Sequence, residues 1–127
     1  MKIIDSFYMG MIAHIGDAKI KVKWISKEKA RETLRLSSSK TESYVGDADT
    51  AKLFERELQV PVKFNRCTVE LEEGELVLLG HCIGPRLPEG ATTGVGVYYK
   101  ADTQGLVFLP EGAEIKWATI VALKPWD

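Results

Sequence analysis

Five polar residues stand at three junctions of the chain, and their types suit the handling of a phosphate group. Asp47 precedes a stretch of helical periodicity, Asn65 and Arg66 follow it, and Arg86 and Glu89 lie in a segment interrupted by prolines. Arginine carries a fork of donors that matches phosphate oxygens, and a carboxyl group can serve as an acid or orient an arginine. Side chains at such junctions are often held towards a ligand by the elements on either side. These five residues are therefore the candidate site.

The elements that must position these residues are predicted from hydrophobic periodicity. Helices are expected over 27–36, after the N-cap residue Ser26, and over 48–58, where Asp47 is a suitable N-cap. A hairpin is expected from two strands joined by a tight turn at 72–75. The predicted strands cover 2–8, 18–25, 42–45, 66–71, 76–83, 95–99, 106–109 and 113–123.

The predicted fold class is α+β, with a mixed, mainly antiparallel sheet and two main helices packed on it. A chain of 127 residues is most simply one domain, spanning 1–127. Its 45% apolar and 28% charged residues are ordinary for a globular protein. No apolar run approaches the roughly 20 residues that span a bilayer, and the N-terminus lacks the apolar segment of a secretory signal. A cytoplasmic protein without membrane contact is therefore expected.

The cysteines and histidines do not indicate a metal site. Cys67 and Cys82 form no Cys-x-x-Cys pair, and His14 and His81 are not at zinc-finger spacing. We expect both cysteines to be small buried apolar residues. Each histidine is interpreted first as a hydrogen-bonded core residue, with a role as a proton donor as the alternative. No metal and no cofactor are predicted.

Charge is distributed unevenly along the chain. Residues 1–40 hold nine Lys or Arg against four Asp or Glu, whereas residues 41–127 hold eight against fourteen. The basic N-terminal third could serve a phosphate-bearing ligand, although Lys19, Lys21 and Lys23 also fit the solvent face of an alternating strand. The net charge of −1 argues against a protein that binds duplex DNA non-specifically.

Three segments together resemble a known family. They read YVGDADTAKLF from Tyr44, LQVPVKFNRCTVELEEGE from Leu58, and RLPEG from Arg86. This order is similar to the viral ring nucleases, also described as type III anti-CRISPR proteins, which occur in archaeal viruses, phages and mobile elements. The similarity covers about residues 20–93, and the strand-rich tail 94–127 lies outside it.

The resemblance implies an α+β homodimer that binds a cyclic oligoadenylate in a pocket across the dimer axis. The family's Asn-Arg pair corresponds to Asn65 and Arg66, and its Arg-Leu-x-Glu-Gly segment places Arg86 and Glu89 in the site. Where the family carries its catalytic histidine, this chain carries Asp47. By this resemblance Asn65, Arg66 and Arg86 are candidate ligand-binding residues, and Asp47 and Glu89 are candidate catalytic residues.

Cleavage in such a site would proceed without a metal, by attack of a ribose 2′-hydroxyl on the neighbouring phosphate. Arginines would stabilise the developing charge, and an acid would protonate the leaving oxygen. Histidine, with a free pKa of about 6.5, is suited to that task, whereas an ordinary aspartic acid is ionised near pH 7 and repels phosphate. Two hypotheses remain: a cyclic-nucleotide binder that also cleaves its ligand, or a sponge or non-enzymatic interaction protein on the same scaffold.

Overall fold

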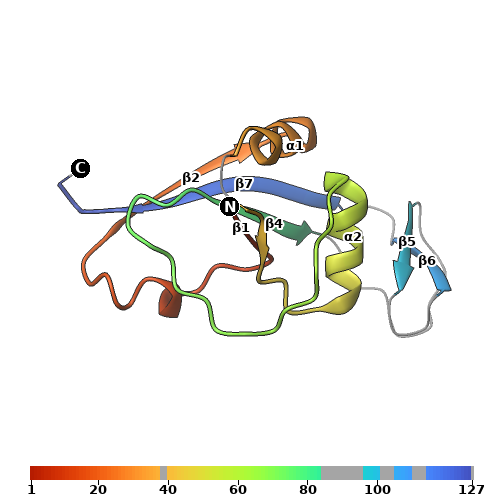
Figure 1. Cartoon of the computed structure of the whole chain (residues 1–127), viewed down its shortest axis with the longest axis horizontal. Helices are drawn as coiled ribbons and strands as arrows, with labels where there is room; N and C mark the ends of the chain where they lie inside the picture. Colours follow the sequence, from red (N-terminus) through yellow and green to blue (C-terminus); the bar gives the residue numbers. More distant parts are fainter. Residues whose placement is uncertain (38–39, 84–95, 101–104, 110–113, 127) are drawn as a thin grey trace.

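The computed structural model describes residues 1–37, 40–83, 96–100, 105–109 and 114–126, and within 83–114 it describes only the backbone of the strands. Its main feature is a five-stranded sheet in the order β2-β7-β4-β1-β3. The strands are β1 Lys2–Ile4, β2 Lys19–Ile25, β3 Glu42–Ser43, β4 Val77–Ile83 and β7 Glu114–Leu123. β1 is parallel to β3 and β4, whereas β7 is antiparallel to both β2 and β4. The predicted α+β class and mixed sheet are confirmed (Figure 1).

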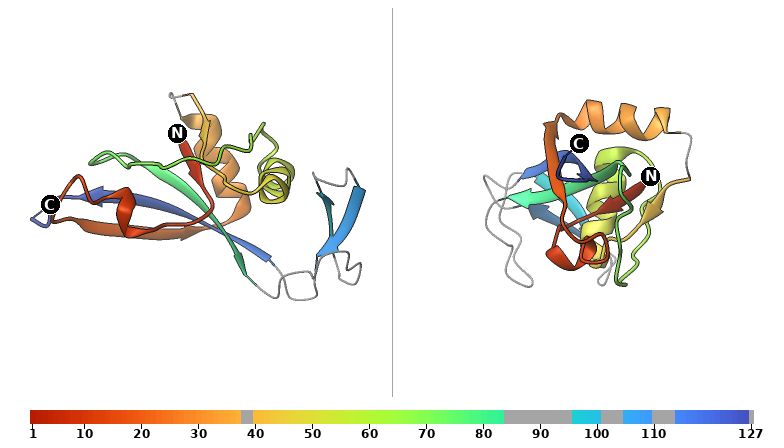
Figure 2. Two further views of the ribbon diagram at one scale, coloured as in Figure 1. Left: turned by 90° about the horizontal axis from the view of Figure 1, so that it is seen from below. Right: turned by 90° about the vertical axis from the view of Figure 1, so that its left-hand side faces the viewer.

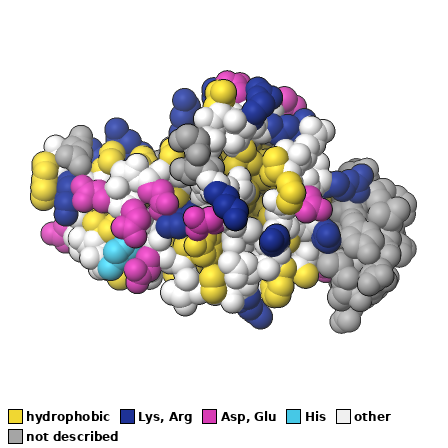
Figure 3. All heavy atoms as spheres, in the orientation of Figure 1, with side chains coloured by type: hydrophobic (Ala, Val, Ile, Leu, Met, Phe, Trp, Pro, Cys, Tyr) yellow, Lys and Arg dark blue, Asp and Glu magenta, His cyan; other side chains and the backbone are white. Residues whose placement is uncertain are grey.

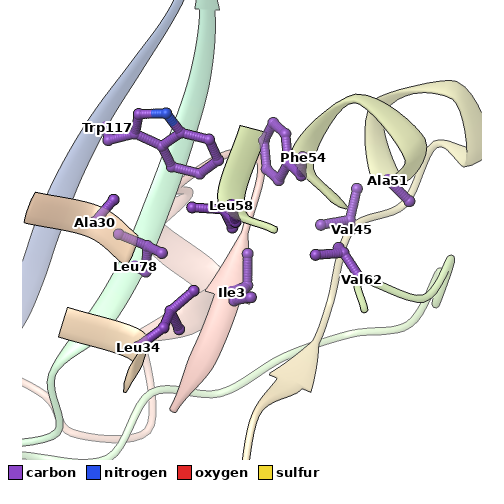
Figure 4. Packing of buried hydrophobic residues seen from close by; sticks show 10 residues of the cluster. All are labelled: Ile3, Ala30, Leu34, Val45, Ala51, Phe54, Leu58, Val62, Leu78 and Trp117. Atoms are coloured by element: carbon purple, nitrogen blue, oxygen red, sulfur yellow. The ribbon is translucent and has the colours of Figure 1, made fainter. Parts of the chain in front are cut away.

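Two helices cover one face of the sheet, as the periodicity predicts. They are α1 Lys27–Leu36 and α2 Ala48–Leu58. Their buried residues meet Ile3, Leu78 and Trp117 of the sheet in one core cluster (Figures 2 and 4). α1 begins where the Ser26 hydroxyl accepts a hydrogen bond from the Lys29 amide at 3.0 Å. None of the helices in the described part of the chain is long and apolar enough to cross a membrane.

The other face of the sheet is covered in part by irregular segments. A short 3₁₀ helix, η1 Met9–Met11, and the extended segment 66–75 pack here against Val77, Leu79 and Ile120. The backbone amide of Leu71 donates to the carbonyl of Met11 at 2.8 Å. The first strand, predicted over 2–8, ends at Ile4. Residues 5–8 are not part of any strand.

The predicted hairpin of 66–71 with 76–83 is wrong. The turn exists, since the amide of Glu75 donates to the carbonyl of Glu72 at 3.1 Å and Gly74 has a φ of 79°. However, both edges of β4 are occupied by β1 and β7, so no edge remains for residues 66–71. The alternation in that segment instead reflects Val69 and Leu71, which are buried without forming a strand.

Two expectations about burial are also wrong. Both Cys67 and Cys82 are exposed rather than buried. On β2, Lys21 and Lys23 are exposed as predicted and Lys19 is partly exposed, but the apolar residues Val22 and Trp24 are 49% and 55% exposed as well. The irregular segments cover the sheet only in part, and this portion of β2 lies outside the residues that they bury.

The C-terminal tail has two different roles. β5 Gly96–Lys100 and β6 Gly105–Leu109 pair as a separate two-stranded sheet, in agreement with the predicted strands. β7, by contrast, lies inside the main sheet between β2 and β4. Within the tail, β7 is therefore an integral part of the main sheet.

Candidate functional site

The first residue of the candidate site, Asp47, is the N-cap of α2, as predicted. Its Oδ1 accepts a hydrogen bond from the Asp49 amide at 3.0 Å, and its Oδ2 accepts one from the Thr50 hydroxyl at 3.2 Å. The backbone carbonyl of Asp47 accepts from the Ala51 amide at 2.9 Å. Both carboxylate oxygens of this exposed residue are thus engaged in starting the helix.

The loop before Arg66 is fastened to the end of β3. The Asn65 amide donates to the carbonyl of Val45 at 2.9 Å, and the Asn65 side-chain Nδ2 donates to the carbonyl of Ser43 at 2.8 Å. The Ser43 hydroxyl in turn donates to the carbonyl of Lys63. The Asn65 side-chain amide therefore holds this loop against the end of β3, which fixes the position of the next residue, Arg66.

Arg66 lies beside the start of α2. A Cβ placed on Gly46 would be 3.7 Å from Cγ of Arg66, so the arginine stem runs along Gly46. The Arg66 side chain is exposed, and among the described residues it has no ion pair or hydrogen bond. Asp47, Asn65 and Arg66 are therefore brought together at one junction.

Two further residues join this junction that the sequence does not indicate. Asp5 follows β1 directly, and Cys82 lies near the end of β4. Although Cys82 as a residue is exposed, the surrounding protein displaces part of the water around its thiol; this desolvation raises the pKa of the thiol, and the negative charges of Asp5 and Asp47 raise it further. The Cys82 thiol thus lies within electrostatic reach of both carboxylates. The signal that would have revealed them is the parallel pairing of β1, β3 and β4, because the carboxyl ends of parallel strands meet at one edge.

The other two candidates, Arg86 and Glu89, lie outside the described residues. In the sequence, Arg86 comes three positions after Ile83, the last residue of β4. The chain therefore leaves β4 at the edge of the sheet that carries Asp5 and Asp47.

The histidines do not complete this site. His81 is exposed rather than buried in the core, and it alternates with Cys82 along β4, so the two side chains point to opposite faces. His14 has its Nδ1 at 3.9 Å from a carboxylate oxygen of Glu70. That glutamate belongs to an acidic group of exposed or partly exposed side chains around segment 66–75, and Figure 3 shows acidic side chains gathered at the end of the molecule opposite β5 and β6.

A family model described as STIV B116-like matches residues 3–95 of the chain. The chain belongs to the STIV B116-like family. The matched range includes all five candidate residues. Among solved structures, the fold is similar to that of B116 of Sulfolobus turreted icosahedral virus, with a TM-score of 0.65 and 18% identity, over 94% of this chain and 97% of that chain. No curated protein matches the chain.

Membership in the family and likeness to B116 bear on the fold of the whole chain. Since the structural likeness covers 94% of this chain, it extends into the C-terminal tail that the family model does not match. At 18% identity the likeness concerns the fold alone. The chemistry of the site therefore depends on the residues of this chain.

Proposed function

We propose that this protein binds a cyclic oligoadenylate-type second messenger as a homodimer, in the cytoplasm of a host cell and in a counter-defence setting. Membership in a family that is named after a viral protein supports the setting. The three segments similar to viral ring nucleases support the ligand. The observation that carries the proposal is the position of Arg66 beside Gly46 at the N-terminus of α2.

This junction offers two kinds of positive potential to a phosphate. The guanidinium of Arg66 is exposed and can turn its donors to phosphate oxygens. The N-terminus of α2 adds the positive end of a helix dipole. Arg86 supplies a second cation in this proposal, and Glu89 orients it. In a symmetric dimer each of these groups occurs twice around the axis, which suits a cyclic ligand with repeated phosphates.

The residues at the junction favour retention of the ligand over its cleavage. Asp47 holds its carboxylate in two hydrogen bonds within α2, so it serves the helix as a cap. An ionised carboxylate cannot protonate a leaving oxygen. We therefore place the protein with non-cleaving binders, which sequester the messenger and keep it from its receptor.

The test is incubation with a panel of cyclic oligoadenylates and cyclic dinucleotides, followed by thermal shift and by chromatography of the products. We expect at least one cyclic oligoadenylate to raise the melting temperature, and we expect the ring to be recovered intact. Linear products would show that Asp47 or another group supplies the acid and that the protein cleaves its ligand as a ring nuclease does.

The same ligand then serves to test the arginines. Arg66→Ala should weaken binding by tens-fold, because a hydrogen bond to a charged group contributes about 1.5–3 kcal/mol. Arg35→Ala is the control, since Arg35 is an exposed arginine in the last turn of α1. If no member of the panel shifts the melting temperature, the proposal fails and the alternative, a non-enzymatic interaction protein, takes its place.

A further inference from the structure

One edge of the main sheet is open along the length of a strand. β2 is the outermost strand of the sheet, and each of its seven residues is paired with β7 on one side. Within the part of the chain that the structure describes, no strand pairs with the other side of β2, on the rim of the sheet (Figure 2). The opposite rim is formed by β3, which is only two residues long. Backbone groups that point outwards from β2 are therefore a template for a further strand.

The two faces of β2 carry different side chains. Alternation along the strand places Lys19, Lys21 and Lys23 on one face and Ile20, Val22 and Trp24 on the other. Val22 and Trp24 lie opposite Ile120 and Ala118 of β7, which are buried. Val22 and Trp24 are nevertheless exposed, because β7 flanks them on one side only. A strand added to the edge would cover their outer side.

The lysines of β2 carry positive charge that is not neutralised nearby. None of the three forms an ion pair with another described residue. On β7, Lys21 lies opposite Val121 and Lys23 lies opposite Thr119, so the cross-strand neighbours are uncharged. An added strand would therefore meet a row of positive charges at every second position of the edge.

This row of lysines discriminates between possible partner strands. A second copy of β2 with its faces aligned would place lysine opposite lysine, and like charges in such pairs are destabilising. With its faces reversed, the second copy would place lysines against the apolar face that contains Val22 and Trp24. Lysine on an edge strand is a common protection against self-pairing for these reasons. A strand with a carboxylate at every second position would instead gain a favourable pair with each lysine.

We propose that the β2 edge binds an extended acidic segment of a partner protein, which adds a further strand to the main sheet. In this segment carboxylates alternate with apolar side chains. The carboxylates pair with Lys21 and Lys23, and the apolar side chains cover Val22 and Trp24. Main-chain hydrogen bonds supply the affinity of such a contact, and the alternate side chains supply its specificity. The surface is separate from the Asp47 junction, and this proposal does not rest on the proposed function.

The test is titration of the full chain with a synthetic peptide of the length of β2, in which glutamate alternates with valine. We expect saturable binding, and residue-resolved hydrogen exchange should become slower at the β2 amides that are not bonded to β7. Two control peptides separate the contributions. One has the same composition with its glutamates grouped at one end, and the other is N-methylated throughout, which removes every backbone donor. Both controls should bind about ten-fold more weakly or worse.

Charge reversal tests the role of the lysines. Lys21→Glu combined with Lys23→Glu should raise the Kd of the glutamate peptide by about ten-fold or more, because two attractive pairs become repulsive. A peptide with lysine in place of glutamate should bind this variant and not the natural chain. Arg35→Glu combined with Lys40→Glu is the matched control, since both residues are exposed and neither belongs to β2. The control should leave the Kd unchanged.

Two further variants test the apolar face and the independence of the surface. Trp24→Thr removes the apolar side chain and keeps a residue that favours strands, so it should weaken the peptide several-fold with little change in the melting temperature. Arg66→Ala should leave peptide binding unchanged, because Arg66 lies at the Asp47 junction.

Four results would overturn this proposal. The first is the absence of saturable binding by the alternating peptide, and the second is equal binding by the peptide with grouped glutamates. The third is binding that leaves hydrogen exchange in β2 unchanged. The fourth is slow exchange of the outward β2 amides in the free protein, which would mean that a second copy or another segment of the chain already occupies the edge.

Discussion

At the scale of single residues, Asp47 combines two effects that can be separated. Its carboxylate caps α2 through the Asp49 amide and the Thr50 hydroxyl, and its negative charge is one residue from Gly46, along which the Arg66 stem runs. Capping stabilises the fold, whereas the charge opposes a phosphate. In the proposed binder, the attraction of Arg66 for a phosphate is therefore opposed by the carboxylate of Asp47.

Asp47→Asn should keep the cap and remove the charge. Asparagine is as good an N-cap as aspartate, so the free energy of unfolding should change little. Binding of a cyclic oligoadenylate should strengthen several-fold, because the repulsion is lost. Urea unfolding and titration measure the two effects, and Asp47→Ala, which removes the cap as well, should cost about 1 kcal/mol. Weaker binding by Asp47→Asn would mean that the carboxylate itself contacts the ligand.

The Cys82 thiol reports on the same charges. Burial, Asp5 and Asp47 raise its pKa above the ordinary value of 9.0, so less thiolate is present at a given pH. Alkylation of Cys82 at pH 8, measured in a Cys67→Ser background, should therefore be slower than that of an unfolded peptide. Asp5→Asn should make it faster. An unchanged rate would show that Asp5 does not influence the thiol.

The raised pKa of Cys82 also makes the stability of the fold depend on pH. Because the folded-state pKa of Cys82 is raised, the protonated thiol is favoured in the fold. Stability from this source is complete below the ordinary thiol pKa and is lost as pH rises from there through the folded pKa. Near pH 7 it is fully present.

At the scale of elements, β4 is the strand on which the core is assembled. It pairs on one side with β1 and on the other with β7, and Gly80 lies under the edge-to-face pair of Phe54 and Trp117. The two ring centroids are 4.8 Å apart at 60°. The absence of a side chain at Gly80 is what allows α2 and β7 to meet over this strand.

Gly80→Ala should destabilise the protein. The new methyl group would lie 2.4 Å from Cζ of Phe54 and 2.6 Å from Cζ3 of Trp117, so both rings must move. Overpacking of this kind costs about 1–3 kcal/mol in the free energy of unfolding. Gly46→Ala is the control, since its nearest neighbour would be at 3.7 Å, and it should change stability by less than about 1 kcal/mol. Equal midpoints in urea for the two variants would contradict this packing.

At the scale of the whole molecule, the proposed function requires two copies of the chain. A cyclic ligand with repeated phosphates is matched when Arg66 approaches it from both sides of a symmetry axis. We expect sedimentation equilibrium to give twice the 14.1 kDa mass of the chain at micromolar concentration. The mass of a single chain, measured with saturating ligand, would contradict the symmetric pocket.

The sequence by itself determined the local features of this protein. Both helices begin and end where capping residues and periodicity place them, because such signals act within a few residues. The long final strand was predicted from the same kind of local signal. Asp47 as an N-cap belongs to this group, and so does the choice of Arg66 as a candidate cation.

Only the tertiary structure decided which strands pair and which side chains meet. The extended segment 66–71 has the alternation of a strand, yet β4 pairs with β1 and β7, which are distant in sequence. The same long-range pairing brings Cys82 within electrostatic reach of both Asp5 and Asp47. Periodicity records which face of a segment is buried, but it carries no information about the partner strand. The candidate site depends on that partner strand.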